Sequence, residues 1–150
     1  MLIVSKCLAG EPCRYDGRDN LVPEIRALVE TGRALAVCPE VLGGLPTPRV
    51  PSECRGGRVV NARGADVTEA FERGAARAME LCRRNGCTAA VLKARSPSCG
   101  KGMIYDGSFT GTLVPGSGVF ARELLRAGIP VLTEEEFGEK EKRHEISADL

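Results

Sequence analysis

The chain contains no tryptophan, and aromatic residues make up only 4% of its 150 residues. Proteins that bind single-stranded nucleic acid stack the bases on aromatic side chains, so this shortage disfavours such a function. Neither charge dominates, because 21 Lys and Arg residues are balanced by 20 Asp and Glu residues. A basic surface for a polyanion is therefore not predicted, and we do not expect nucleic acid as a partner.

Long hydrophobic runs are also missing from the sequence. A helix that crosses a bilayer needs about 20 apolar residues in succession, and no segment approaches this length. The apolar segment at residues 2–5 is too short to be the core of a signal peptide. We therefore expect no membrane partner and a cytoplasmic location, in which cysteine thiols stay reduced.

Histidine is limited to one residue, His144, which lies in a charged segment near the end of the chain. No two cysteines have the Cys-x-x-Cys spacing of structural zinc sites, so the sequence does not favour zinc. Cysteine itself is abundant, with seven residues. A secreted disulfide scaffold is usually shorter and carries an even number of cysteines. We therefore expect these thiols to be buried side chains, metal ligands or nucleophiles.

Short apolar segments alternate along the chain with segments of helical periodicity. Strands are predicted at residues 2–5, 34–37, 89–92 and 129–132. Helices are predicted at residues 23–31, 67–85, 119–126 and 134–137, a Gly- and Pro-rich loop at 39–51, and a hairpin or loop excursion at 103–113. Strands that alternate with helices are typical of a parallel sheet. The predicted fold is α/β, a single domain over residues 1–137 with a Rossmann-like parallel sheet covered by helices on both faces, followed by a charged tail at 138–150.

The segment at residues 67–85 has the strongest helical pattern. Asp66 precedes it and Glu69 follows three residues later, which is the arrangement of a capping box. One face of this helix is apolar and consists of Val67, Phe71, Ala75, Ala78 and Cys82. Cys82 is therefore expected in the core, and so is Cys87, which lies just before a predicted strand.

Three other cysteines occupy equivalent positions at predicted strand ends. Cys7 follows the first strand, Cys38 ends the second, and Cys99 lies in the loop after the third. Strand ends of a parallel sheet meet at one edge, where such sheets bind ligands. Three thiolates can hold three corners of a cubane iron–sulfur cluster and leave one iron for a soft sulfur ligand. One such cysteine alone would suggest a small buried side chain, but three in Gly- or Pro-rich loops favour a cluster site.

The remaining two cysteines lie in predicted loops. Cys13 is close to Cys7 in a tight turn and could serve as a persulfide relay or a resolving thiol. A purely structural role is the alternative. The same roles are less favoured for Cys54, whose function the sequence leaves open.

Two residues beside the cysteines could transfer protons. Glu40 follows Cys38 by two residues and could act as a general acid or base, or could instead bind loop amides. Ser98 precedes Cys99 in a turn that Pro97 and Gly100 make rigid. Its hydroxyl could bind substrate or carry a proton.

Further polar residues near the predicted edge could bind a substrate. They are Lys93, Ser96, Arg14 and Asp16, and for the charged ones ordinary ion pairs in loops are the alternative. The segment Gly116-Ser-Gly precedes a predicted helix and could bind an anion, or could simply be the start of that helix.

Together, several motifs resemble the thiouracil desulfidase family in its short, stand-alone form. The similarity covers about residues 1–137, and the combination of Cys-Pro-Glu with Ser-Pro-Ser-Cys-Gly is its most specific part. The motifs are Ser5-Lys-Cys-Leu8, Arg14-Tyr-Asp-Gly17, Cys38-Pro-Glu-Val41, Pro48-Arg49, Gly64-Ala-Asp-Val-Thr68, Lys93 with Ser96-Pro-Ser-Cys-Gly100, and Tyr105-Asp-Gly-Ser-Phe-Thr-Gly111.

This resemblance implies a [4Fe-4S] cluster held by Cys7, Cys38 and Cys99. It further implies that the free iron takes sulfur from a thiolated nucleobase such as thiouracil, without redox chemistry. Glu40 and a serine of the turn would handle protons. Larger relatives of that family carry an extra C-terminal domain, which is not expected for this sequence.

Two alternatives stay open on the sequence alone. The protein could be a sulfur carrier or sulfurtransferase with Cys13 as a relay, or a non-enzymatic module that binds a metal or a cluster. The physiological substrate and the oligomeric state do not follow from the sequence.

Overall fold

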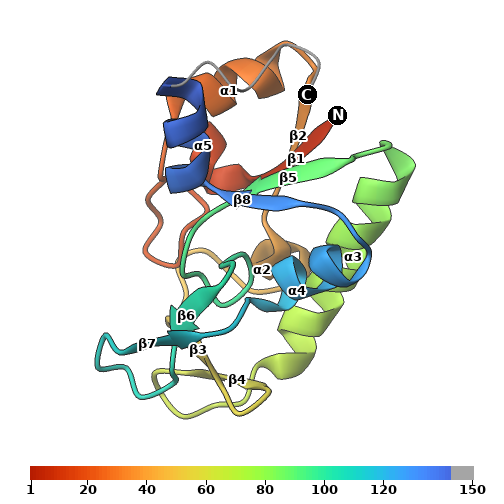
Figure 1. The fold of residues 1–150 in the computed structure, drawn as a ribbon. Coiled ribbons are helices and arrows are strands. Elements are labelled where there is room, and N and C mark those ends of the chain that lie inside the picture. Colours follow the sequence, from red (N-terminus) through yellow and green to blue (C-terminus); the bar gives the residue numbers. More distant parts are fainter. Residues whose placement is uncertain (143–150) are drawn as a thin grey trace.

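A computed structural model describes residues 1–142 of the chain. Its centre is a four-stranded sheet in the order β2-β1-β5-β8 (Figure 1). The strands are β1 (Leu2–Ser5), β2 (Ala34–Val37), β5 (Ala89–Leu92) and β8 (Val131–Thr133). Every pair of neighbours is parallel, and Ile3 of β1 stands opposite Leu35 and Ala90. The predicted parallel sheet is therefore confirmed.

Helices cover both faces of this sheet. Helices α1 (Pro23–Glu30) and α5 (Glu134–Lys142) lie on one face, and α3 (Thr68–Arg84) and α4 (Val119–Arg126) on the other (Figure 1). Successive side chains of a strand point to opposite faces. Accordingly, Val4 packs in a cluster with Ile25 and Phe137, whereas Ile3 packs in a second cluster with Phe71 and Phe120.

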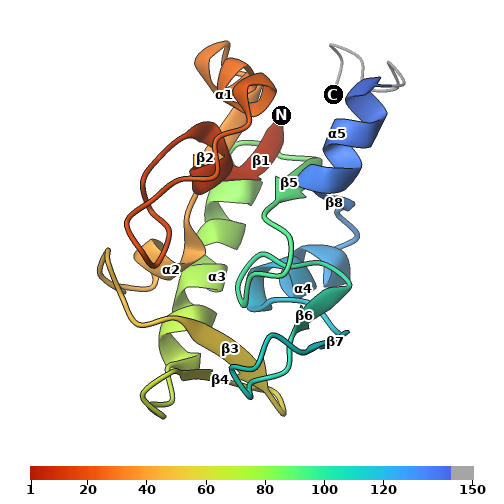
Figure 2. The ribbon, with the colours of Figure 1, turned by 90° about the vertical axis from the view of Figure 1, so that its left-hand side faces the viewer.

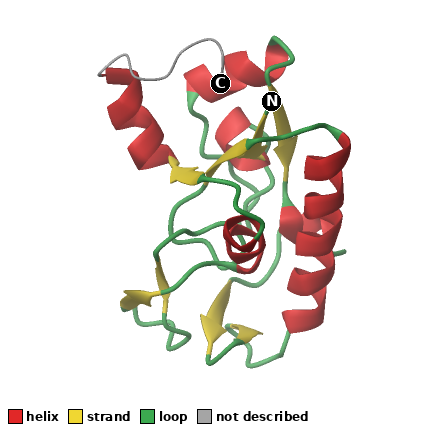
Figure 3. Ribbon diagram, turned by 45° about the vertical axis from the view of Figure 1, so that its right-hand side comes forward, coloured by secondary structure: helices red, strands yellow, loops and turns green. Residues whose placement is uncertain are grey.

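Two antiparallel hairpins lie apart from the central sheet (Figure 3). The first pairs β3 (Ser52–Arg55) with β4 (Arg58–Asn61), and the second pairs β6 (Met103–Tyr105) with β7 (Leu113–Pro115). Strands β3 and β6 are in contact (Figure 2). The second hairpin was predicted as a hairpin or loop excursion. The first was not predicted, although both residues of its Gly56-Gly57 turn have the positive φ that such turns need.

Short helical turns follow two of the strands directly. The 3-10 helix η1 (Lys6–Ala9) follows β1, and α2 (Pro39–Leu42) follows β2. The prediction of a loop throughout residues 39–51 is therefore wrong for its first turn. Pro39 occupies the first helical position, where its fixed φ suits a helix and its missing N–H leaves no hydrogen bond unmade.

Helix α5 is longer than the sequence pattern predicted. It ends at Lys142 rather than Phe137, so the first residues of the expected charged tail are helical. Three glutamates in its first turn and Lys140 and Lys142 in its last turn complement the helix dipole. The rest of the predicted tail, including His144, lies outside the described residues. Within residues 1–142, no helix is both long and apolar enough to span a membrane.

Helix α3 approaches α2 at two glycines. A methyl group on Gly74 would overlap the carbonyl oxygen of Pro39, and one on Gly43 would overlap that of Ala70. The two backbones therefore touch without an intervening side chain. This contact fixes α2, and with it Glu40, against the longest helix of the fold.

A methyl group at this contact is expected to be costly. Gly74→Ala should lower the free energy of unfolding by about 1–3 kcal/mol, because backbone atoms must move apart to accept it. Gly138→Ala is the matched control, because Gly138 lies in α5 with nothing within 4 Å of the new methyl group. It should stabilise the protein by up to about 1 kcal/mol, since alanine favours helix. Urea unfolding of both variants measures the difference, and equal effects would show that α2 and α3 are not in tight contact.

Candidate active site

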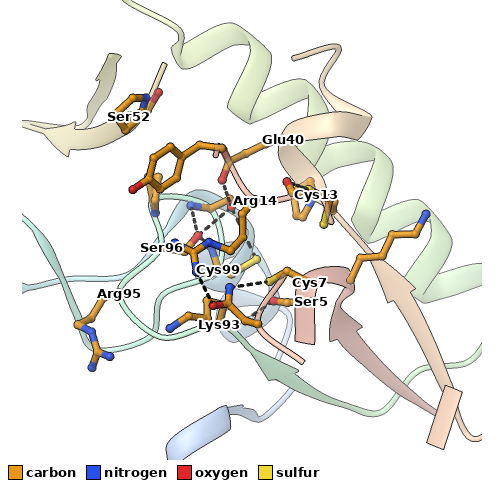
Figure 4. A pocket seen from close by; sticks show the side chains of 18 of the residues that line it. Ser5, Cys7, Cys13, Arg14, Glu40, Ser52, Lys93, Arg95, Ser96 and Cys99 are labelled. Carbon is orange, nitrogen blue, oxygen red and sulfur yellow. Dashed lines mark hydrogen bonds between the residues drawn. The ribbon is translucent and has the colours of Figure 1, made fainter. Parts of the chain in front are cut away.

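The carboxyl ends of β1, β2 and β5 border a cavity of about 440 Å³ (Figure 4). It is lined by the three segments that follow these strands and by the loops around Cys13 and Arg49. Because the three strands are neighbours in a parallel sheet, their ends meet at this edge. The cavity lies where the sequence placed a ligand site.

All three strand-end cysteines line the cavity. Cys7 lies in η1 after β1, Cys38 precedes α2 after β2, and Cys99 lies in the loop after β5. Cys7 and Cys38 are half-buried, and Cys99 is buried. The structure therefore brings together three thiols that lie up to 92 positions apart along the chain (99 − 7).

Hydrogen-bonding groups surround the three sulfurs. The amide of Asn20 donates to Cys7 Sγ at 3.4 Å, and the hydroxyl of Ser98 lies 3.6 Å from Cys99 Sγ. Cys13 is a fourth thiol in the cavity wall, and its single S–H can donate to either Cys7 or Cys38. Donors of this kind stabilise the negative charge of a thiolate.

The three thiols differ in their readiness to ionise. The hydrogen bond from Cys13 lowers the pKa of Cys38 to about 6, and it also lowers the pKa of Cys7, although burial opposes both shifts. Burial raises the pKa of Cys99 to about 12. A metal-bound thiol is deprotonated outright, so cluster binding would release the proton of Cys99.

The donor set fits an iron–sulfur cluster better than a single ion. Within residues 1–142, no three or more His, Cys, Asp and Glu side chains are grouped so that they could hold one metal ion. Cluster ligands bind different irons and stand apart around the cubane. Three thiols line one cavity of about 440 Å³, an arrangement compatible with that requirement.

A chain of hydrogen bonds joins Glu40 to the loop that carries Cys99. Ser98 Oγ lies 2.9 Å from Glu40 Oε2, and Ser96 Oγ lies 3.0 Å from Ser98 Oγ. Ser96 Oγ also accepts the backbone N–H groups of Ser98 and Cys99. An ionised carboxylate only accepts, so Ser98 donates to Glu40 and Ser96 donates to Ser98.

Helix α4 holds this loop from behind. The N–H groups of Val119 and Phe120 donate to the carbonyl oxygens of Pro97 and Ser98, each at 2.9 Å. A methyl group on Gly118 would overlap the backbone of Ser98. The Gly116-Ser-Gly segment is therefore the start of a helix whose first amides bind the loop, and the alternative of an anion site is not supported.

A family model described as 2-thiouracil desulfurase matches residues 2–136. The chain belongs to the 2-thiouracil desulfurase family. The resemblance found in the sequence motifs is thereby confirmed.

Two relatives of this desulfurase-family chain extend the comparison. The uncharacterized protein YbbK of Bacillus subtilis (strain 168) is 42% identical over 149 residues, which cover 93% of this chain and 99% of YbbK. A solved structure described as the [4Fe-4S]-dependent thiouracil desulfidase TudS is 49% identical, with a TM-score of 0.87. That match covers 92% of this chain and 93% of TudS.

Not all of the predicted substrate-binding residues face the cavity of this family member. Lys93, Ser96 and Arg14 line it, whereas Asp16 does not. Asp16 instead pairs with Arg14 at 3.1 Å, and Lys93 Nζ pairs with Glu134 at 2.7 Å. All three charged residues therefore form ion pairs, which was the alternative to substrate binding. Lys93 and Arg14 also line the cavity, so for these two residues both roles are compatible.

Three residues that contact functional side chains of the site had no role in the sequence-based prediction. Arg49 lies 3.0 Å from Glu40, Asn20 binds Cys7, and Glu134 binds Lys93. Arg49 does belong to one of the family motifs, in Pro48-Arg49, which was the available signal. Asn20 and Glu134 carry no such signal.

The remaining cysteines lie outside the cavity. Cys54 Sγ donates to the carbonyl oxygen of Pro97 at 3.6 Å, and burial raises its pKa. It therefore supports the back of the Ser96–Cys99 turn. Cys82 and Cys87 are buried, as predicted, and Cys82 packs in the core cluster beneath α3.

Proposed function

We propose that this chain removes sulfur from a small thiolated compound, such as a thiolated nucleobase of the thiouracil type, with the help of a [4Fe-4S] cluster. The observation that carries the proposal is the meeting of three strand-end thiols and the Glu40–Ser98 pair in one cavity. Membership in the 2-thiouracil desulfurase family supports it, and so does the 49% identity to TudS.

Cys7, Cys38 and Cys99 would hold the cluster. With three protein ligands, a bound cluster supplies one iron that is free to act as a Lewis acid toward the sulfur of the substrate. Asn20 donates a hydrogen bond to Cys7 Sγ, and the Ser98 hydroxyl, whose proton is directed to Glu40, lies 3.6 Å from Cys99 Sγ. Cys13, which contacts Cys7 and Cys38, adds a further donor in this proposal.

Glu40 and Ser98 would transfer the protons. In a hydrolytic desulfuration, a thiocarbonyl compound and water give a carbonyl compound and hydrogen sulfide, so no electrons are gained or lost. The attacking water loses a proton, which Glu40 Oε2 is placed to accept directly or through Ser98. The same carboxyl group can then return the proton to the departing sulfur or the ring.

The substrate would be oriented by polar side chains in the cavity wall. Lys93 is fixed by Glu134, and Arg14 is fixed by Asp16 and Asn20, so both present their charge at a defined place. The hydroxyl of Ser96 lies 3.0 Å from that of Ser98 and lines the same cavity. A cytoplasmic location belongs to this proposal, because a reducing compartment keeps the cysteines available as ligands.

Anaerobic reconstitution followed by assay in ¹⁸O-labelled water tests the proposal. With 2-thiouracil and 4-thiouracil as substrates and no reductant, we expect repeated turnover, free sulfide, and one labelled oxygen in each product. Sulfur that stays bound to the protein in a single turnover would favour a carrier with Cys13 as relay. A cluster-loaded protein without any turnover on thiolated bases would favour a non-enzymatic cluster-binding module.

A further inference from the structure

The most deeply placed cation of the cavity wall is Arg49. Its side chain is only 7% exposed, and that of its partner Glu40 is 14% exposed. The other ion pairs at the cavity are more accessible to solvent. An ion pair this far from water is held by its geometry and is screened little by salt.

The guanidinium of Arg49 uses its donors on several partners at once. Its Nε binds Glu40 Oε1 at 3.0 Å, and its Nη2 binds the carbonyl oxygen of Cys13 at 2.8 Å. Its Nη1 binds the carbonyl oxygen of Pro46 and the hydroxyl of Thr47. These hydrogen bonds to two loops fix the orientation of the planar guanidinium group, independently of its contact with the Glu40 carboxylate.

This arrangement assigns different partners to the two oxygens of Glu40. Oε1 accepts from Arg49, and Oε2 accepts from Ser98. With Oε1 held, the carboxylate cannot rotate away from Ser98 without breaking a buried ion pair. The oxygen that faces the proposed proton-transfer chain is thus selected by Arg49.

The other cations of the cavity wall for which the structure describes an ion pair are each paired with a different carboxylate. Lys93 is engaged by Glu134, Arg95 by Glu135, and Arg14 by Asp16. A lysine at position 49 would offer one compact ammonium group. This group cannot donate to Glu40 and to the Cys13 carbonyl oxygen at the same time with the geometry of the planar guanidinium.

We propose that Arg49 is a positioning residue, which holds the Glu40 carboxylate so that Oε2 faces Ser98 and the substrate. The inference rests on the proposed function, in which Glu40 transfers the proton. Arg49 itself need not touch the substrate or the cluster. Its removal should therefore impair the chemical step more than substrate binding.

Steady-state kinetics of Arg49→Lys on cluster-loaded protein test the inference. Misplacement of a catalytic group by about 1 Å can cost about 10²-fold in rate. We expect kcat per cluster to fall by about this factor, with KM within about threefold and iron content unchanged. Arg58→Ala is the matched control, because Arg58 also forms a 3.0 Å ion pair, with Asp66, but both side chains are exposed. It should retain the wild-type kcat.

Chemical rescue distinguishes positioning from a general loss of structure. In Arg49→Ala, low millimolar guanidinium should restore part of kcat, because Arg49 borders the cavity and the vacated space is accessible. The same salt should not restore Glu40→Gln. Wild-type kcat in cluster-replete Arg49→Lys, or an equal fall of kcat in Arg58→Ala, would overturn the inference. A wild-type protein without turnover would instead overturn the proposed function, and this assignment with it.

Discussion

Replacement of Cys38 by serine should abolish cluster binding in the reconstituted protein. The same result is expected for Cys7→Ser and Cys99→Ser, because each variant removes one of the three strand-end thiolates that are proposed to hold the cluster. Iron content should fall from about four atoms per chain to near zero. Anaerobic reconstitution, with iron and sulfide analysis and visible absorbance on the same sample, measures this directly.

Cys82→Ala provides the control for the ligand variants. Cys82 is 1% exposed and packs in the core under α3, away from the cavity. Loss of its sulfur should reduce the free energy of unfolding by about 1 kcal/mol and leave the iron content unchanged. If a folded Cys82→Ala protein lost its iron, or if Cys38→Ser kept a full cluster, the assignment of ligands would be wrong.

Glu40→Gln should retain the cluster and lose most of its turnover. Glutamine has nearly the same shape and can still meet Ser98, but its amide cannot accept a proton from water. Removal of a general acid–base group typically costs about 10²–10⁴ in rate. The measurement is kcat per intact cluster, and Ser98→Ala should show a smaller loss because water can partly replace a hydroxyl.

Glu53→Gln is the matched control for Glu40→Gln. The carboxylate of Glu53 also lies at the cavity, but it accepts the N–H groups of Gly107 and Phe109. A glutamine oxygen can accept both of these hydrogen bonds, so kcat should stay within about tenfold of wild type. Near wild-type turnover in cluster-replete Glu40→Gln would remove Glu40 from the mechanism and favour a sulfur carrier.

The convergence of the three cysteines could be predicted from the sequence because it depends only on topology. Short β-branched and apolar segments that alternate with amphipathic helices specify a parallel sheet, and the residues after its strands must share one edge. The positions of Cys7, Cys38 and Cys99 after β1, β2 and β5 follow from that rule. Cys82 could be assigned to the core for a similar reason, since it belongs to the periodic face of α3.

The contacts that position the side chains of the site could not be predicted in the same way. The pairs Arg49–Glu40, Asn20–Cys7 and Lys93–Glu134 join irregular loops to one another or to a helix start. No hydrophobic period encodes the path of such loops. Helix α2 and the β3–β4 hairpin were missed because each has only four-residue elements, too short for a periodic pattern to be recognised.

The most direct test of cluster-dependent, non-redox desulfuration is the rate of sulfide release in a series of samples with graded cluster content. Samples of the same protein are loaded to different iron levels, and sulfide and uracil are measured anaerobically with 4-thiouracil and no electron donor. The account predicts a rate proportional to cluster content, with one sulfide formed per uracil. Release that is independent of cluster content, or that requires an added reductant, would contradict it.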